Sequence, residues 1–141
     1  MTVSGAVVVI AVLAGGSGAD LARRFAAADA AGMLIADTHV GVAEDLAAEL
    51  DRPGCPVVGV SGDIRRPSDV AALVDTAEKH FGPIDLFCVA GPKGERIVSL
   101  ADLPAHLDLE RLAELVVLIG EAIGELVPPQ RSASERTATA A

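Results

Sequence analysis

The stretch Ala11–Phe25, which reads AVLAGGSGADLARRF, joins an apolar run to a segment with helical spacing through a cluster of glycines. The whole apolar run, Ala6–Leu13, is rich in valine and is typical of a strand buried on both faces. Leu21 and Phe25 are four residues apart, which places both on one face of a helix. The first amides of a helix lack internal partners, and the helix dipole favours negative charge there. This turn is therefore a candidate phosphate-binding site.

The chain continues to residue 91 as an alternation of short apolar runs and segments with helical spacing. Strands are expected over Ala6–Leu13, Met33–Ala36, Val57–Ser61 and Ile84–Val89, and helices over Ala19–Ala31, Val42–Leu50 and Ser68–Phe81. Gly32 is expected to end the first helix and Ser68 to cap the third, while Val42, Leu46 and Leu50 form the apolar side of the second. Such an alternation over short connections predicts a three-layer α/β domain with four parallel strands in the order 3-2-1-4. The fourth strand then lies at an edge of the sheet.

The segment after Gly91 has a different pattern. Pro92–Pro104 is predicted to be a loop, and its charged residues Lys93, Glu95 and Arg96 are typical of a solvated segment, with ligand contact as the alternative.

The last apolar segment, Leu107–Val127, is predicted to be a helix because its glutamates fall on roughly one stripe. Its apolar residues cover more of the circumference than one sheet face can bury, and Gly120 and Gly124 would let another helix approach closely. An interface with another subunit and burial against its own sheet both remain open. Residues 128–141 are small and polar, and we expect a disordered tail there behind a domain of residues 1–127.

The composition limits the class of protein. A net charge of −9 argues against nucleic acid or anionic lipid as the main partner. No lysine or arginine precedes Arg23, and Ala6–Ala14 is too short to span a bilayer, so we expect neither a signal peptide nor a membrane helix. Cys55 and Cys88 do not make a disulfide framework, and the three histidines are scattered. We therefore expect reduced thiols, a cytoplasmic location and no metal site.

Two acidic residues follow predicted strands. Asp37 comes 19 residues after Gly18, and Asp63 follows the third strand. Ligands of parallel α/β sheets bind at the carboxyl ends of the strands, where a carboxylate about 20 residues after the glycine turn accepts hydrogen bonds from a ribose. The spacing leaves open whether these residues form a nucleotide site or are solvated strand ends.

Three stretches of the chain resemble the N-terminal half of the short-chain dehydrogenase/reductase family over about residues 6–91. They are IADTHVGVAEDLAAEL, GDIRRPSDVAALVDTAEKHFGPIDLF and CVAG. The resemblance implies a Rossmann-like fold, with Asp37 selecting NAD over NADP and Asp63 and Ile64 at the adenine contact. CVAG stands where the family has N-N-A-G. The cofactor-binding residues that the resemblance implies are Gly16, Ser17, Gly18, Asp37, Asp63, Ile64, Ala90 and Gly91.

The glycine turn departs from the family pattern T-G-x-x-x-G-x-G. The matching stretch is Leu13–Asp20, and of the three motif glycines it keeps only Gly18. Ala14 crowds the backbone approach, and Asp20 places a carboxylate where a pyrophosphate would bind. Two unit charges about 4 Å apart at an effective dielectric near 20 repel by roughly 4 kcal/mol. We therefore expect either no cofactor or weak NAD binding.

The chain also lacks the family's catalytic motif Y-x-x-x-K, because it contains no tyrosine. It ends at about half the family's usual length, so the part that binds nicotinamide and substrate is expected to be missing, and the catalytic residues are unknown. The leading hypothesis is a truncated relative that acts as an accessory or oligomerising subunit, alone or with a related reductase. Two alternatives are a cofactor-independent isomerase or cyclase that uses Asp63 or Asp37 as acid or base, and an NAD-dependent oxidoreductase completed by another chain.

Overall fold

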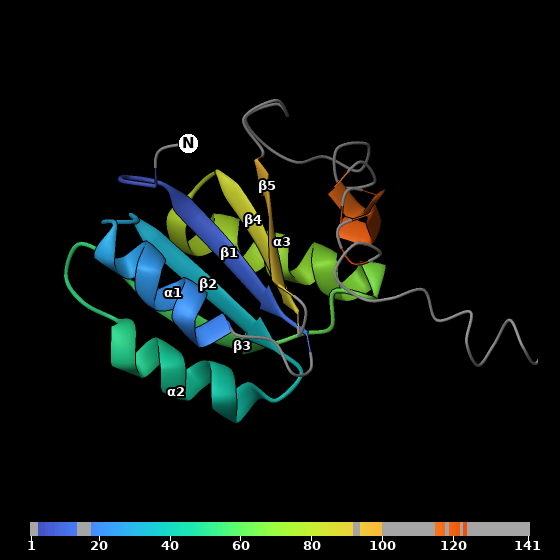
Figure 1. The fold of residues 1–141 in the computed structure, drawn as a ribbon, viewed down its shortest axis with the longest axis horizontal. Helices are drawn as coiled ribbons and strands as arrows, with labels where there is room; N and C mark the ends of the chain where they lie inside the picture. Colours follow the sequence, from blue (N-terminus) through green and yellow to red (C-terminus); the bar gives the residue numbers. More distant parts are fainter. Residues whose placement is uncertain are drawn as a thin grey trace, which may run out of the picture.

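The structure is a computed structural model that describes residues 3–13, 18–91, 94–99, 115–117, 119–121 and 123. A five-stranded sheet lies between helices on its two faces (Figure 1). The strands are β1 (Val7–Val12), β2 (Gly32–Asp37), β3 (Val57–Ser61), β4 (Leu86–Gly91) and β5 (Gly94–Ser99), and the helices are α1 (Gly18–Ala27), α2 (Val40–Leu50) and α3 (Pro67–Phe81). The predicted α/β class and the strand order 3-2-1-4 are confirmed, with a fifth strand added next to β4.

Each face of the sheet has its own apolar core because successive side chains of a strand point to opposite faces. Val8 and Ile10 of β1 lie in the core under α1 and α2, whereas Val9 packs with Val70 and Leu73 of α3. β1 is central, and its parallel neighbours β2 and β4 lie on either side of it. This position explains why the sequence of β1 is apolar throughout rather than alternating.

The main error of the sequence-based fold is the loop predicted over Pro92–Pro104. Residues 94–99 form β5, which pairs antiparallel with β4, so β4 is not the edge strand that was predicted. Within β5 only Ile97 and Val98 are large apolar residues, because most of this strand is exposed and it needs few apolar side chains. Glu95 of β5 forms an ion pair with Arg24, which connects the strand to α1.

Two predicted ends of helices are also wrong. α1 ends at Ala27 rather than Ala31, because the chain turns back into β2 through Asp29, which has a φ of 65°. In α3 the capping residue is Arg66 and not Ser68, because Pro67 occupies the first turn. Proline suits that position, since its fixed φ is helical and its missing N–H would have no helical partner.

α2 packs on the sheet through small residues rather than through the predicted apolar side. Ala43 and Ala47 are buried, whereas Val42 is 57% exposed and Leu46 and Leu50 are only partly buried. A Cβ on Gly59 of β3 would lie 2.3 Å from the carbonyl oxygen of Ala43, so the helix and strand approach closely here. This close approach leaves Val42 and Leu46 at the side of α2 that faces α1.

The described part of the predicted helix Leu107–Val127, which comprises residues 115–117, 119–121 and 123, is helical. Leu115 and Ile119 are buried in the same core as α3, and Val116 and Ile123 pack partly against it. Val117 is 59% exposed on the outer side. The rest of this predicted helix and the predicted tail 128–141 lie outside the described residues.

Candidate functional site

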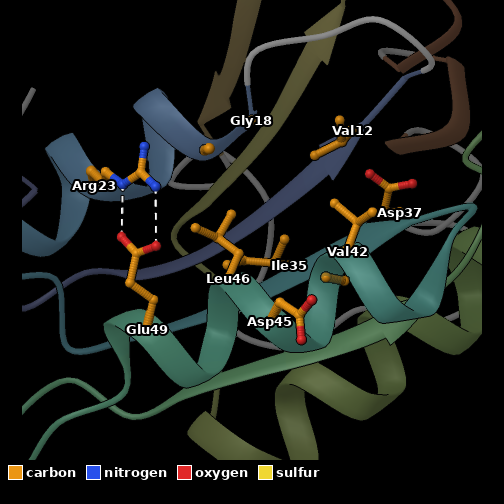
Figure 2. A pocket seen from close by; sticks show the side chains of 11 residues that line it. Val12, Gly18, Arg23, Ile35, Asp37, Val42, Asp45, Leu46 and Glu49 are labelled. Carbon is orange, nitrogen blue, oxygen red and sulfur yellow. Dashed lines mark hydrogen bonds and ion pairs between the residues drawn. The ribbon is translucent and has the colours of Figure 1, made fainter.

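A pocket of about 340 Å³ opens between α1 and α2 at the carboxyl ends of β1 and β2 (Figure 2). Its floor is apolar and includes Val12, Ile35 and Leu46. Asp37 lies at one end of the pocket, and an ion pair between Arg23 and Glu49 lies at the other. The pocket therefore has an apolar interior and a charged rim.

Asp37 is held in place by the turn that follows β2. Its side chain is 14% exposed, and its Oδ1 accepts a hydrogen bond from the backbone N–H of His39 at 2.8 Å. Oδ2 accepts no hydrogen bond from the described residues. This oxygen can accept a hydrogen bond from a ligand hydroxyl, because an ionised carboxylate is an acceptor only.

The ion pair at the far end of the pocket joins the two helices. Arg23 of α1 donates from Nε to Glu49 Oε2 at 2.8 Å and from Nη2 to Oε1 at 3.0 Å. The hydrogen bond from Arg23 lowers the pKa of Glu49, so Glu49 stays ionised. Asp45 also lines the pocket, which therefore carries more carboxylates than guanidinium groups. Such a rim disfavours an anionic ligand group.

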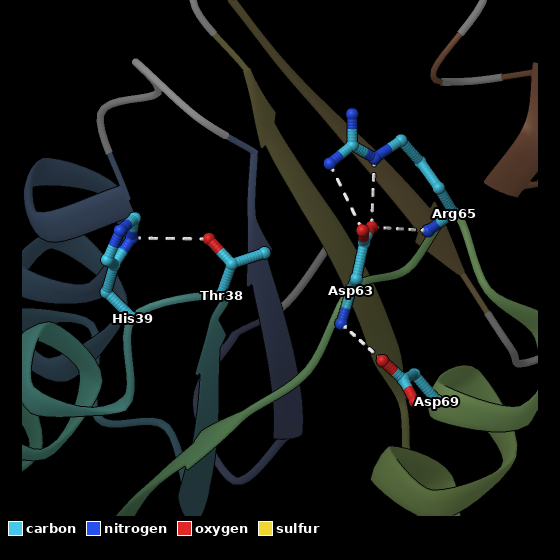
Figure 3. Close-up of polar contacts among 5 residues, drawn as sticks. All are labelled: Thr38, His39, Asp63, Arg65 and Asp69. Atoms are coloured by element: carbon cyan, nitrogen blue, oxygen red, sulfur yellow. Dashed lines mark hydrogen bonds and ion pairs between the residues drawn. The ribbon is translucent and has the colours of Figure 1, made fainter.

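Asp63 follows β3 and engages the loop that leads to α3 (Figure 3). The Nε and Nη2 atoms of Arg65 donate to Oδ1 at 2.9 Å and to Oδ2 at 3.1 Å. The backbone N–H of Arg65 also donates to Oδ1, at 3.0 Å. The hydrogen bonds from Arg65 hold the pKa of the Asp63 carboxyl below its usual value, although partial burial opposes the shift.

Asp37 and Asp63 belong to neighbouring strand ends, but only Asp37 lines the pocket. Asp37 pairs with Ser61 in the β2–β3 register, and its carbonyl accepts the N–H of Gly62 at 3.1 Å. The two carboxylates therefore lie at the same edge of the sheet and make no contact with each other. A ligand would have to extend across this edge to touch both.

Known proteins are similar to this chain both in sequence and in fold. The family model described as short chain dehydrogenase matches residues 6–111. The chain belongs to the short-chain dehydrogenase family. Among curated proteins, the 1-deoxy-11-beta-hydroxypentalenate dehydrogenase of Streptomyces arenae is 38% identical over 91 residues, which are 62% of this chain and 32% of the relative. The chain therefore spans about a third of the length of this relative.

Two solved structures are similar to this fold. A 3-ketoacyl-(acyl-carrier-protein) reductase from Brucella melitensis, complexed with NADH, has a TM-score of 0.51 and 34% identity over 60% of this chain and 34% of that chain. A short chain dehydrogenase/reductase from Burkholderia phymatum, in complex with NAD, has a TM-score of 0.54 and 31% identity over 62% of this chain and 31% of that chain.

The structure brings together some of the site residues predicted from the short-chain dehydrogenase resemblance. Gly18 and Asp37 both line the pocket. Ile64 and Ala90 are buried and Gly91 ends β4, but none of these three lines it, and neither does Asp63. Gly16 and Ser17, together with Ala14 of the same turn, lie outside the described residues.

Asp20 lies in the first turn of α1, as predicted, but it is well solvated. Its side chain is 77% exposed, and Oδ1 lies 3.8 Å from Nη1 of Arg23. Water screens such a charge strongly, so the repulsion of about 4 kcal/mol that a dielectric near 20 gives is too large. In bulk water two unit charges about 4 Å apart repel by about 1 kcal/mol, so Asp20 would oppose a phosphate less strongly than the sequence-based estimate implies.

The sequence-based prediction missed Arg23, Asp45 and Glu49 as pocket residues. Asp45 and Glu49 are four residues apart, which places both on one face of α2, together with Val42. That spacing was visible in the sequence, but only the packing of α2 shows that this face borders the pocket beside α1, where its side chains stay exposed.

The remaining candidates have simple structural explanations. Cys88 is fully buried in β4, and burial raises the pKa of its thiol to about 12, so it stays protonated and unreactive. Burial also raises the pKa of Cys55. In the described part of the chain, no cluster of three histidine, cysteine or acidic side chains could hold a metal, and no helix is long and apolar enough to cross a membrane.

Proposed function

We propose that this chain binds the adenosine half of NAD weakly, and that it transfers no hydride by itself. It acts as an accessory or oligomerising subunit, with copies of itself or with a related reductase. The observation that carries the proposal is the position of Asp37, whose Oδ2 is available at the mouth of the pocket while Oδ1 is fixed by His39.

The ribose and the adenine would occupy neighbouring strand ends. The ribose hydroxyls would donate to Asp37, as they do to a carboxylate at this position of a dinucleotide-binding fold. The adenine would lie toward Asp63 and Ile64, whose strand end is joined to Asp37 by the hydrogen bond from Gly62. A phosphate on the ribose 2′-hydroxyl would meet the negative charge of Asp37, so NADPH would bind more weakly than NAD. The NADH and NAD complexes of the two similar structures support this choice.

The weak affinity follows from the charges around the pocket. Asp37, Asp45 and Glu49 line it, and Asp20 lies on the first turn of α1. The guanidinium of Arg23 is already engaged by Glu49. A pyrophosphate near this rim would be repelled by more charges than attract it.

The absence of hydride transfer follows from the residue types available. These 141 residues include no tyrosine, so they cannot supply the proton donor of the family motif. Asp63 is a poor substitute as a general base, because its hydrogen bonds with Arg65 lower its pKa. An accessory role is supported by the exposed Val117 on the outer side of the last helical segment, whose inner side is already buried.

The ligand proposal can be tested by following backbone amide NMR signals during titrations with NAD and NADPH. We expect a dissociation constant for NAD of about 1 mM or weaker. Asp37→Asn removes a charged acceptor and should weaken NAD binding about tenfold. NADPH binding should stay unchanged or become tighter, because the charge that repels its 2′-phosphate is removed. Glu44→Gln, which removes an equal charge from an exposed position of α2 outside the pocket, is the control. Micromolar NAD affinity, or equal affinities of wild type and Asp37→Asn, would contradict the proposal.

The catalytic part is tested separately with the purified chain, model ketones or alcohols, and either nicotinamide cofactor. We expect no change in NADH or NADPH absorbance. Turnover that co-purifies with the chain and is lost on Asp63→Asn, but not on Glu44→Gln, would show that the chain is an enzyme.

A further inference from the structure

The loop between β3 and α3 folds back on Asp63. Arg65 is two residues further along the chain, yet both its guanidinium and its backbone N–H donate to the Asp63 carboxylate. Asp69 Oδ2 in turn accepts the backbone N–H of Asp63 at 2.9 Å, which fixes the start of the loop relative to α3. Figure 3 shows the Arg65 side chain lying over the carboxylate.

These contacts use much of the acceptor capacity of Asp63. A carboxylate has two oxygens with about four lone-pair sites. Oδ1 accepts two hydrogen bonds from Arg65, and Oδ2 accepts one. The guanidinium is planar and binds both oxygens, so it occupies the side from which a second planar donor would approach.

We propose that Arg65 competes with adenine for Asp63, so that Arg65 limits the affinity of this chain for adenine-containing ligands. The inference rests on the proposed function, because it takes the adenine of the ligand to lie at Asp63. The exocyclic amine of adenine is a hydrogen-bond donor, and its acceptor on the protein would be an oxygen that the guanidinium now holds. Adenine that approaches from the side covered by the guanidinium would have to displace it.

The competition is weak enough to be reversible. The Arg65 side chain is 61% exposed, so it can leave Asp63 and be hydrated without rearrangement of the core. Exposed ion pairs contribute little to stability, and the expected gain on removing this one is about two- to fivefold in ligand affinity.

The test uses adenosine as the probe, because adenosine is uncharged and its binding does not respond directly to the loss of a positive charge. NMR titrations would compare wild type with Arg65→Gln and with Arg66→Gln. Arg66 is the matched control, since it influences Asp63 through its charge but makes no hydrogen bond with that carboxylate. We expect Arg65→Gln to bind adenosine about two- to fivefold more tightly, and Arg66→Gln to bind as wild type does.

A double-mutant cycle with Asp63→Asn completes the experiment. The gain from Arg65→Gln should be smaller or absent when Asp63 is replaced, because the competing pair is then already broken. Equal or weaker adenosine binding by Arg65→Gln, with measurable binding by wild type, overturns this inference and leaves the proposed function intact. An absence of adenosine binding to every variant, Arg65→Gln included, overturns both.

Discussion

Gly18 and Val12 lie so close together that a side chain at position 18 would force Val12 or α1 to shift. A Cβ on Gly18 would be 2.3 Å from Cγ2 of Val12. Gly18 begins α1 and Val12 ends β1, so this contact sets how near the helix comes to the strand. The one family glycine that the turn keeps is therefore required by packing, whatever the turn still does with phosphate.

Gly18→Ala is expected to destabilise the fold by about 1–3 kcal/mol, because the added methyl must push α1 away from β1. Val12 is β-branched and has few alternative rotamers with which to make room. Thermal or urea unfolding measures the change. Gly41→Ala in α2 is the control, since a Cβ there meets nothing within 4 Å. Alanine is a better helix former than glycine, so this control should be neutral or stabilising, and an equal loss in both variants would contradict the packing argument.

A second test concerns how strongly the charge of Asp20 opposes the pyrophosphate of NAD. Asp20→Asn should tighten NAD binding about two- to fivefold at low salt, because it removes a well-solvated charge near the helix N-terminus. The gain should vanish at about 1 M salt, where the screening length falls to about 3 Å. Asp75→Asn on α3 is the control: it pairs with Lys79 on the opposite face of the sheet. A gain of a hundredfold or more, or none at low salt, would contradict this view of Asp20.

The central strands could be predicted from the sequence because they are buried in the sheet, and burial requires apolar residues along the strand. β3 begins and ends where the sequence predicts, and β1 differs by one residue at each end. β5 could not be predicted in the same way, because an exposed edge strand needs little apolar surface, and Gly94–Ser99 contains charged residues at its centre. Its place in the sheet depends on pairing with β4, which is a contact made only in the folded chain.

The same contrast applies to the site. Asp37 was predicted from its distance to Gly18 and from the end of a strand, and the structure places it at the pocket. The ion pair between Asp63 and Arg65 could not be predicted. An aspartate two residues before an arginine forms such a pair only when the loop adopts the required turn. Spacing identifies which residues reach a sheet edge, but not which of them are already engaged by neighbours.

The buried thiol of Cys88 predicts a decrease in stability at high pH. Its pKa is raised from 9.0 to about 12 in the folded protein, so the folded state keeps a proton that the unfolded state loses. The stabilisation is fully present below about pH 9 and is lost as the pH rises toward 12, by at most about 1.4 kcal/mol per pH unit. No tyrosine titrates in this range, since the chain has none.

Urea unfolding between pH 8 and pH 10.5 measures this slope. Cys88→Ala is expected to lower the stability at every pH but to flatten the slope, because the titrating group is removed. Cys55→Ala is the matched control, and it should flatten the slope less than Cys88→Ala does, because Arg52 opposes part of the rise that burial, Asp51 and Asp29 give to the pKa of that thiol. A Cys88→Ala slope as steep as that of wild type would contradict the assignment.

The last prediction concerns association. β5 covers the edge of β4, and Val116 and Ile123 pack against the core of their own chain. A charged substitution in β4, at Val116 or at Ile123 would therefore disturb the fold and would not test an interface. Among the described residues of this helical segment, Val117 is the well-exposed apolar side chain, and it lies on the side away from the sheet. If the chain associates through this helix, Val117→Lys should convert the assembly to monomers while the circular dichroism spectrum stays unchanged. Val42→Lys is the matched control, because Val42 is almost equally exposed but lies on α2. Size-exclusion chromatography with light scattering measures the mass, and a wild-type monomer at tens of micromolar, or equal effects of the two lysines, would rule out an interface on this helix.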